Sequence, residues 1–235
     1  MIMDDINYGH ATHVGHVSKQ NDDSYLVDTS TGLWIVSDGL GGHESGDVAS
    51  AIVVESIAKS VQKGLGLVDA LAVAHKAILK ARSKGKGSTG MAATAVALKL
   101  NGNQYEVGWI GDSRAYLWDQ KLHQLTSDHT YVQRLVDDGE LEAEEAQRHP
   151  ERSFLTQALG TLRTQDVSPE TISGHLSHEN QVMLCSDGLT DELSDVQIAS
   201  ILGQEMSEQK KVDSLIQSAL DNGGSDNITV LLISV

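Results

Sequence analysis

The stretch Leu33-Trp34-Ile35-Val36-Ser37-Asp38-Gly39 is an apolar run that ends in a Ser-Asp-Gly triplet, and Val182-Met183-Leu184-Cys185-Ser186-Asp187-Gly188 repeats this pattern. Short apolar runs closed by a glycine turn predict buried β-strands. Each strand would then deliver one carboxylate, Asp38 or Asp187, to its C-terminal end. Two carboxylates in equivalent settings predict one shared site, and oxygen ligands of this kind favour a hard divalent cation.

Length and charge limit the possible functions. The 235 residues are sufficient for one large domain, so we expect a single domain over residues 1–235. Seventeen basic against 33 acidic residues give a formal charge of −16, which argues against a nucleic-acid-binding protein. No apolar run is long enough for a membrane span. The acidic N-terminus, which lacks a secretion signal, and the single Cys185 favour a cytoplasmic location.

The predicted elements follow the order strands, helix pair, strands, helix pair, strand. Helices grouped in this way indicate an α+β layered domain, with sheets inside and helix pairs outside. Asn101-Gly102 predicts a hairpin turn, and residues 129–158 are polar, acidic and helical in pattern. Strands are expected at 12–17, 24–28, 33–37, 91–100, 104–110, 114–118, 121–125, 166–173, 181–186 and 227–235. Helices are expected around 48–57 and 67–82, from Ser194 onward, and around 212–220 with an end near Gly223-Gly224.

Further acidic residues share the placement of Asp38 and Asp187 at strand ends or turns. A lone Asp in such a place is usually a turn or cap residue. Clustered carboxylates, however, raise one another's pKa unless cations hold them ionised. Oxygen ligands select Mg²⁺, Mn²⁺ or Ca²⁺ over Zn²⁺, and a pair of such ions is a common way to activate water against phosphorus. The further candidates are Asp22, Asp23, Asp112, Asp128, Asp191 and Asp226.

Four motifs contain most of the candidate carboxylates in a fixed order along the chain. They are Asp38-Gly39-Leu40-Gly41-Gly42-His43, Gly111-Asp112-Ser113-Arg114, Cys185-Ser186-Asp187-Gly188-Leu189-Thr190-Asp191 and Gly224-Ser225-Asp226-Asn227, supported by matches at 15–23, 91–94 and 155–160. In this order they resemble the metal-dependent protein serine/threonine phosphatases of the protein phosphatase 2C (PPM) family, and the short bacterial form is the best match. The resemblance extends from about residue 9 to residue 234. It implies a four-layer α/β/β/α sandwich with two central, mainly antiparallel β-sheets flanked by helix pairs.

The resemblance also implies roles for individual residues. Two Mn²⁺ or Mg²⁺ ions would occupy the core site, and a third, weaker ion would lie at Asp128, Asp187 and Asp191. Asp112 and Arg114 would be structural. At the core site, Asp38 would bridge the two ions and Gly39 would offer its carbonyl to one of them. Asp187 and Asp226 would complete the ligand shell of the second ion, and Asp22 and Asp23 would hold ion-bound waters.

The implied reaction is direct hydrolysis of phosphoserine and phosphothreonine by a water that bridges the two ions. Asp38, Asp187 and Asp226 would act through the ions, and His43 would protonate the leaving oxygen. The partners would be phosphorylated proteins and a cognate serine/threonine kinase. Residues 129–160 would form a flap beside the active site, and its acidic stretch 137–145 is either a solvated face or a contributor to substrate choice.

The sequence departs from the family pattern at the residue that grips the substrate phosphate. Ser18 stands where the family carries Arg, and Asp22 stands where it carries Glu. Neither Ser18 nor its neighbour Lys19 reproduces a bidentate guanidinium. On an extended strand, moreover, Lys19 would point to the opposite face. We therefore expect a competent metal site with weak phosphate capture and a raised KM, and Ser18 and Lys19 are the candidate phosphate contacts.

Two other functions remain open. A catalytically weakened relative would bind phosphoproteins as a regulator, as Ser18 suggests. Another two-metal phosphoesterase, such as a nuclease, is disfavoured by the acidic charge. The basic loop around Lys84-Gly85-Lys86-Gly87-Ser88-Thr89 resembles a phosphate-binding P-loop only superficially, since Lys86 is followed by Gly87 and the first glycine of the motif is missing.

Overall fold

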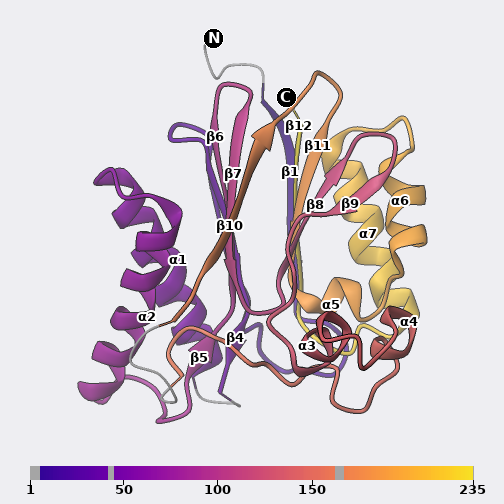
Figure 1. Cartoon of the computed structure of the whole chain (residues 1–235). Coiled ribbons are helices and arrows are strands. Elements are labelled where there is room, and N and C mark those ends of the chain that lie inside the picture. Colours follow the sequence, from indigo (N-terminus) through magenta and orange to yellow (C-terminus); the bar gives the residue numbers. More distant parts are fainter. Residues whose placement is uncertain (1–5, 42–44, 162–166, 235) are drawn as a thin grey trace.

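Two antiparallel β-sheets face each other in the computed structural model, which describes residues 6–41, 45–161 and 167–234 (Figure 1). The first sheet has the order β1 (Asn7–His13), β12 (Ile228–Ser234), β11 (Gln181–Cys185), β8 (Arg114–Trp118) and β9 (Leu122–Gln124). The second has the order β10 (Glu170–His175), β7 (Gln104–Ile110), β6 (Ala95–Asn101), β3 (Leu33–Ser37) and β2 (Ser24–Asp28). A short pair, β4 (Gly39–Leu40) and β5 (Ala92–Ala93), extends from the lower edge.

Alternation along the strands divides the core into layers. In β3, Trp34 and Val36 point into the space between the sheets, where they pack with Val182 and Leu184 of β11. Leu33 and Ile35 of the same strand point outward to the helices. Successive strand residues face opposite sides, so a strand that is covered on both faces is buried throughout and mostly apolar. β3 and β11 are buried at every position, and each has one polar residue, Ser37 in β3 and Gln181 in β11.

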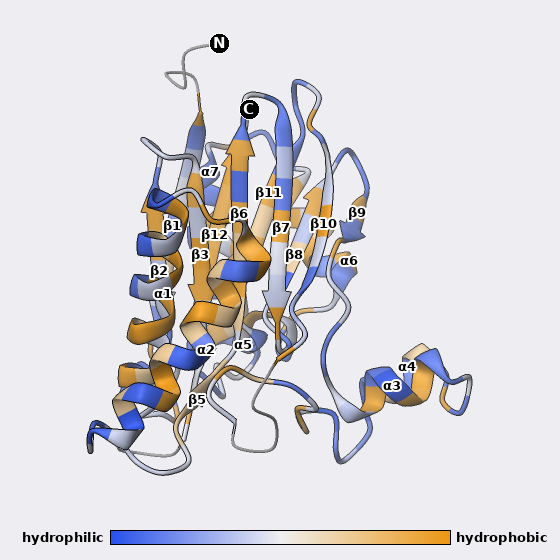
Figure 2. Ribbon diagram, turned by 60° about the vertical axis from the view of Figure 1, so that its left-hand side comes forward, coloured by the Kyte–Doolittle hydropathy of each residue, from blue (hydrophilic) through white to orange (hydrophobic). Residues whose placement is uncertain are grey.

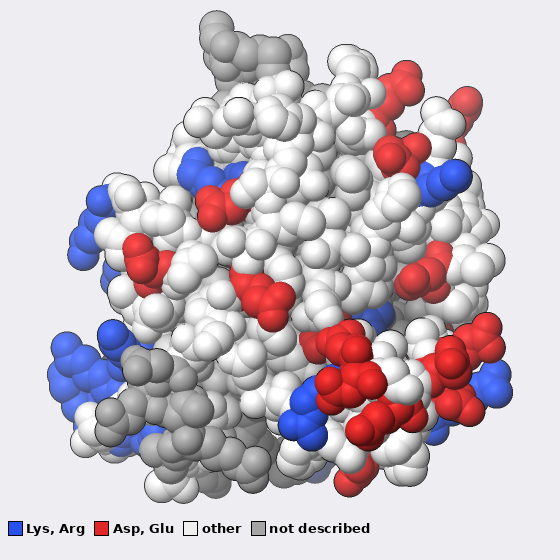
Figure 3. Space-filling model, viewed as in Figure 1, with Lys and Arg blue, Asp and Glu red and all other residues white. Residues whose placement is uncertain are grey.

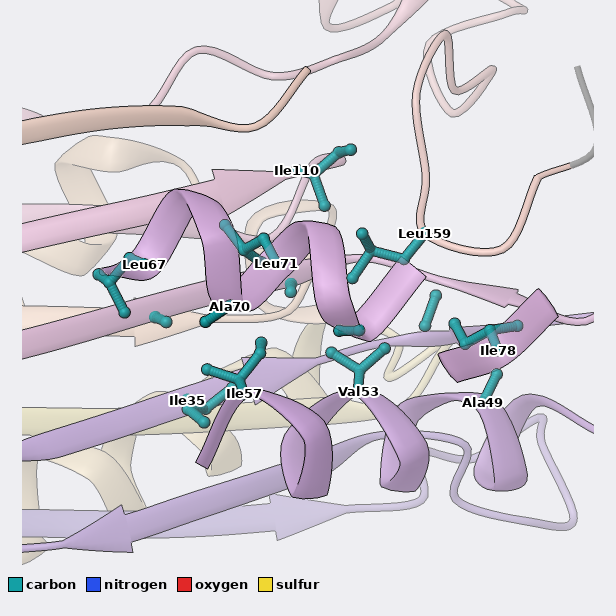
Figure 4. Packing of buried hydrophobic residues seen from close by; sticks show 14 of the residues in the cluster. Ile35, Ala49, Val53, Ile57, Leu67, Ala70, Leu71, Ile78, Ile110 and Leu159 are labelled. Atoms are coloured by element: carbon teal, nitrogen blue, oxygen red, sulfur yellow. The ribbon is translucent and has the colours of Figure 1, made fainter. Parts of the chain in front are cut away.

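Helices cover the outer faces of both sheets. On the second sheet, α1 (Gly46–Gln62) and α2 (Leu67–Ser83) contribute Val53, Ile57, Leu71 and Ile78 to the buried cluster that also contains Ile35 of β3 (Figure 4). On the first sheet, α6 (Asp195–Leu202) and α7 (Glu208–Asn222) pack in the same way. Complete burial of one such aliphatic side chain contributes roughly 1.5–3 kcal/mol. The expected four-layer α/β/β/α arrangement is confirmed.

The chain between β9 and β10 leaves the sheets. It carries the short helices α3 (Tyr131–Asp137) and α4 (Ala143–Ala146), which stand away from the sandwich in Figure 2. The segment predicted to be broadly helical is thus mostly irregular. A further short helix, α5 (Asp187–Thr190), follows β11 directly. Among the described helices, none combines the length and the apolar character needed to cross a membrane.

Several predicted boundaries were wrong. The first strand is β1 at 7–13, not 12–17, because Gly15 has φ +78° and turns the chain away. The strand expected at 91–100 is split at Thr94 into β5 and β6, and the one expected at 166–173 begins at Glu170. The hairpin turn is Gly102-Asn103 rather than Asn101-Gly102, because Asn101 still pairs with Gln104. The helix α5 and the strand β4 were not foreseen.

Candidate metal and active site

The two Ser-Asp-Gly strand ends meet at one end of the sandwich, although they belong to different sheets. Asp38 follows β3, and its backbone N–H donates to Thr94 Oγ1 at 3.1 Å. Asp187 opens α5 directly after β11. Burial raises the pKa of Asp38 well above its usual range, and the charge of Asp187 raises it further. Burial and neighbouring carboxylates do the same to the pKa of Asp187. The structure therefore brings both carboxylates into one buried cluster of acidic side chains.

Asp23 joins this cluster from the loop between β1 and β2. Its Oδ2 accepts hydrogen bonds from Ser186 Oγ at 2.8 Å and Thr229 Oγ1 at 2.6 Å. Its Oδ1 is buried and has no hydrogen-bond partner, and the same holds for Oδ1 of Asp187. Burial raises the pKa of Asp23 to about 6, against the opposing effect of the two hydroxyl donors. A buried carboxylate oxygen without a hydrogen-bond donor is a candidate ligand for a cation.

Asp22 lies against the N-terminus of α1. Burial, followed by the charge of Asp47, raises its pKa, whereas a hydrogen bond from the backbone of Asp47 lowers it. The approach is close: a Cβ on Gly46 would stand 2.5 Å from Asp22 Oδ2, and a Cβ on Gly39 would stand 2.0 Å from Gly46 O. Only glycine fits at positions 39 and 46, which explains the Asp-Gly pair that follows β3.

Asn227 organises the loop that carries Asp22 and Asp23, and sequence reasoning missed this role. Its Oδ1 accepts from the backbone N–H of Asp22 at 2.7 Å. Its Nδ2 donates to the carbonyl oxygens of Val14 at 2.8 Å and Gln20 at 3.1 Å. Its own N–H donates to Asp226 Oδ1 at 2.7 Å. Because the buried side-chain amide of Asn227 hydrogen-bonds to the backbone at both ends of this loop, it fixes the positions of the carboxylates of Asp22 and Asp23.

Asn227→Ala is expected to destabilise the fold by roughly 2–4 kcal/mol, because three backbone groups lose their partner in a buried place. Urea unfolding measures this change. Asn222→Ala is the matched control, since that exposed amide donates only to Glu192 O. Equal unfolding free energies for the two variants would contradict the role of Asn227.

The acids assigned to a third ion are arranged differently from the expectation. Asp128 is held by Arg114, whose Nη2 donates to Asp128 Oδ2 at 2.7 Å and whose Nε contacts both carboxylate oxygens at 3.0 Å. Asp112, expected to be structural, is instead the first charged neighbour that raises the pKa of Asp187, followed by Asp191. Burial, with the charges of Asp128 and Asp191, raises the pKa of Asp112 to about 7.

A cavity of about 710 Å³ lies between these acids and the segment that carries α3 and α4. Its walls combine Asp112, Asp187 and Asp191 with apolar side chains such as Val132 and Val136. Across it, Arg152 Nη2 reaches Asp191 Oδ2 at 3.3 Å. The segment predicted to be a flap therefore borders the carboxylate cluster, and the cavity has the size of a site for a small ligand or a peptide side chain.

Of the remaining candidate site residues, the structure describes Ser18, Lys19 and Asp226 but not His43. Ser18 and Lys19 lie in the irregular loop after β1, with Ser18 partly buried and Lys19 exposed. Since this stretch is not a strand, the argument that Lys19 must face away from Ser18 no longer holds. Asp226 is exposed at the rim of the cluster, where its charge raises the pKa of Asp38. His43 lies outside the described residues.

The cluster suits divalent cations by its chemistry. Its donors are carboxylate oxygens, two of them buried without a partner, and the charges that act on Asp38 and Asp187 are all negative. Within the described ranges, no three candidate ligand side chains already converge on one point. Oxygen ligands of this kind fit Mn²⁺ or Mg²⁺.

Sequence comparisons identify relatives of known class. The family model for Protein phosphatase 2C matches residues 11–222. The serine/threonine protein phosphatase PstP of Mycobacterium tuberculosis is 35% identical over 237 residues, which cover 98% of this chain and 45% of PstP. The serine/threonine phosphatase Stp of Listeria monocytogenes is 32% identical over 231 residues, covering 94% of this chain and 91% of Stp. The chain thus spans less than half of the mycobacterial relative.

Solved structures agree with this grouping. The crystal structure of the M. tuberculosis phosphatase PstP/Ppp superposes with a TM-score of 0.88 at 34% identity, covering 98% of both chains. The catalytic domain of PstP in complex with two manganese ions superposes with a TM-score of 0.85 at 32% identity, covering 97% of both chains. The architecture described above is therefore that of a catalytic domain which, in one relative, binds two manganese ions.

Proposed function

This chain belongs to the protein phosphatase 2C family, and on that premise we propose that it hydrolyses phosphoserine and phosphothreonine in proteins with two divalent cations, Mn²⁺ or Mg²⁺. The observation that carries the proposal is the desolvated cluster of Asp38, Asp187 and Asp23, in which two buried oxygens lack donors. Such a cluster is unfavourable unless cations complete it.

In the proposed reaction, the chain's residues hold the cations and orient the substrate. Asp38, Asp187, Asp226 and the carbonyl of Gly39 would hold the ions, and Asp22 and Asp23 would bind their waters. When bound, the ions would supply charge stabilisation on the phosphoryl oxygens and an activated water. Protonation of the leaving oxygen would fall to His43. The phosphate would enter past Ser18 and Lys19, and the 129–160 segment would serve as a flap over the cavity.

A third, weaker ion would lie at Asp112, Asp187 and Asp191 rather than at Asp128. Asp112→Asn is expected to weaken the third Mn²⁺ by roughly tenfold or more, as loss of one carboxylate ligand does. Asp128→Asn should leave that affinity nearly unchanged and instead lower the unfolding free energy, because it breaks the paired contact with Arg114. Mn²⁺ titration followed by electron paramagnetic resonance separates these results, and the reverse pattern would restore Asp128 as the ligand.

Ser18→Arg is expected to lower KM for a phosphothreonine peptide by about threefold to tenfold, with kcat little changed. The reason is that a guanidinium binds phosphate through two parallel hydrogen bonds. Lys121→Arg is the matched control, because it adds a guanidinium at an exposed lysine in the turn between β8 and β9. An unchanged or raised KM in Ser18→Arg would show that this position does not contact the phosphate.

One assay set tests the function itself. The chain is incubated with p-nitrophenyl phosphate, a phosphothreonine peptide and bis-p-nitrophenyl phosphate, with Mn²⁺ or with EDTA. The proposal requires metal-dependent turnover of both monoesters. Binding of the phosphopeptide without turnover would favour a regulator, the alternative suggested by Ser18 in place of the family's Arg. Turnover of bis-p-nitrophenyl phosphate alone would favour a nuclease. A cytoplasmic setting, a single domain over 1–235 and a cognate kinase belong to the same proposal.

A further inference from the structure

Charge is unevenly distributed along this acidic chain. Between Asp69 and Glu106 the sequence has no acidic residue, but it has six basic ones: Lys76, Lys80, Arg82, Lys84, Lys86 and Lys99. The first five form a basic patch on the C-terminal half of α2 and the loop that follows it. Figure 3 shows basic side chains gathered at the lower left, over this end of α2, and acidic ones at the lower right. Such separation in a chain of charge −16 is unexpected for a merely solvated surface.

Four lysines of the basic patch are exposed and available. Lys76, Lys80 and Lys84 follow one another at intervals of four, so they lie on one face of α2 and its C-cap, and Lys86 follows in the loop. None of the five ion pairs within the described residues involves these four lysines. Arg82, by contrast, already binds within the chain, since its Nη1 donates to the carbonyl oxygens of Thr89 and Gly160, both at 3.0 Å.

Helix stability explains only part of the basic patch. Cations in the last turn of a helix interact favourably with its carbonyl end, which accounts for Lys80 and Arg82. Lys76 lies before that turn and Lys86 beyond the helix, so this effect does not explain them. Lys86 is near Glu55 of α1, but Glu55 is already paired with Lys59.

The basic patch lies beside the carboxylate cluster. The backbone N–H of Ser88, two residues after Lys86, donates to Ser45 Oγ at 2.6 Å. Ser45 immediately precedes Gly46, whose Cβ position is 2.5 Å from Asp22 Oδ2. The loop with the lysines thus rests on the start of α1, the same element that meets Asp22. The connection from the basic patch to the cluster therefore runs through the loop at Ser88 and the first residues of α1.

We propose that the basic patch docks an acidic segment of the phosphoprotein substrate, outside the phosphorylated residue; this inference rests on the proposed function. Ammonium groups on side chains four residues apart on a helix stand about 6 Å apart along its axis, so Lys76 to Lys84 span about 12 Å, the length of three or four extended residues. An Asp- or Glu-rich run of that length matches the patch. A longer nucleic-acid strand would extend onto the acidic remainder of the surface.

The test compares Lys76→Gln/Lys80→Gln/Lys84→Gln with Lys63→Gln/Lys121→Gln/Lys210→Gln, which makes the same charge change at exposed lysines elsewhere. Substrates are phosphothreonine peptides with a run of four Glu or four Gln on either side, and p-nitrophenyl phosphate. At low ionic strength, the patch variant is expected to lose about tenfold in kcat/KM on a Glu peptide only, and the loss should vanish at high salt. Equal loss on Gln peptides, or in the control variant, would overturn the proposal.

Direct binding separates this inference from the proposed function. Fluorescence anisotropy follows an unphosphorylated Glu-rich peptide and a single-stranded oligonucleotide of equal charge. Salt-dependent binding of the peptide, lost in the patch variant and kept in the control, supports docking even if no metal-dependent turnover is found, in which case only the function fails. Tighter binding of the oligonucleotide, or no peptide binding by the wild type, overturns the docking surface while the phosphatase assay is unaffected.

Discussion

Asp38→Asn is expected to lower Mn²⁺-dependent kcat/KM by about a thousandfold or more, equivalent to roughly 4 kcal/mol of transition-state stabilisation. The same change should raise the melting temperature of the metal-free chain. Both effects have one cause. Without cations, the Asp38 carboxylate is buried beside Asp187, Asp23 and Asp112, and these charges together raise its pKa well above the usual range. Removing its charge relieves that repulsion but also removes the carboxylate proposed to bridge the two ions.

Opposite changes in activity and stability distinguish a metal-site residue from a structural one. Loss of a structural carboxylate lowers both activity and melting temperature. Steady-state kinetics on p-nitrophenyl phosphate and thermal unfolding in EDTA measure the two effects. Asp213→Asn is the matched control, since Asp213 is exposed on α7 and its side chain accepts a hydrogen bond from Gln209 Nε2 of the same helix at 2.8 Å. A metal-free Asp38→Asn that melts below the wild type would contradict the account of the cluster.

The metal-free chain is also expected to lose stability, by several kcal/mol, as the pH rises from about 4 to above 7. An aspartate in the unfolded chain ionises near pH 3.9. In the folded chain, burial raises the pKa of Asp23 to about 6 and that of Asp112 to about 7. Between these values the folded state binds more protons than the unfolded state. The free energy of unfolding therefore falls with rising pH, and the loss is complete only above the folded pKa values.

Saturating Mn²⁺ should reverse this dependence, because the ions bind ionised carboxylates and compete with protons. Urea unfolding at several pH values, with EDTA or with Mn²⁺, measures both slopes. Asp112→Asn isolates one contribution. In the metal-free variant, the free energy of unfolding should change less steeply with pH, by an amount that corresponds to at most one bound proton, whereas Asp213→Asn should retain the wild-type slope. A metal-free chain that becomes more stable between pH 5 and pH 8 would show that these carboxylates do not carry raised pKa values.

The elements that the sequence predicted well are those whose pattern reflects burial. β3 and β11 are buried at every position and apolar at all but one, because each lies between a helix layer and the other sheet. The helix pairs were found from their apolar stripes for the same reason. Boundaries set by backbone geometry were not predictable in this way. β1 ends where Gly15 meets the carbonyl of Asp226, a contact between residues more than two hundred positions apart.

The residues of the candidate site likewise differ in whether the sequence alone could predict their surroundings. The sequence expected Asp38, Asp187 and Asp23 to share one site, because each flanks a strand of the core, and in the structure the charges of Asp187 and Asp23 act on Asp38. The surroundings of Asp112 and Asp128 could not be predicted, since both stand in turns next to β-strands. Only the structure shows that Arg114 holds Asp128. The same applies to Asn227, whose hydrogen bonds reach across the chain to Val14, Gln20 and Asp22.

Counting bound ions tests the central claim most directly. Isothermal titration of Mn²⁺ into the metal-free chain at about pH 7.5 should give two tight sites per chain. Repeating the titration in buffers of different ionisation enthalpy should show proton release, because carboxylates with raised pKa values must ionise to bind. Asp38→Asn should lose both sites, while Asp213→Asn keeps them. Two tight sites that persist in Asp38→Asn, or no tight site in the wild type, would contradict the claim that this cluster is the metal centre.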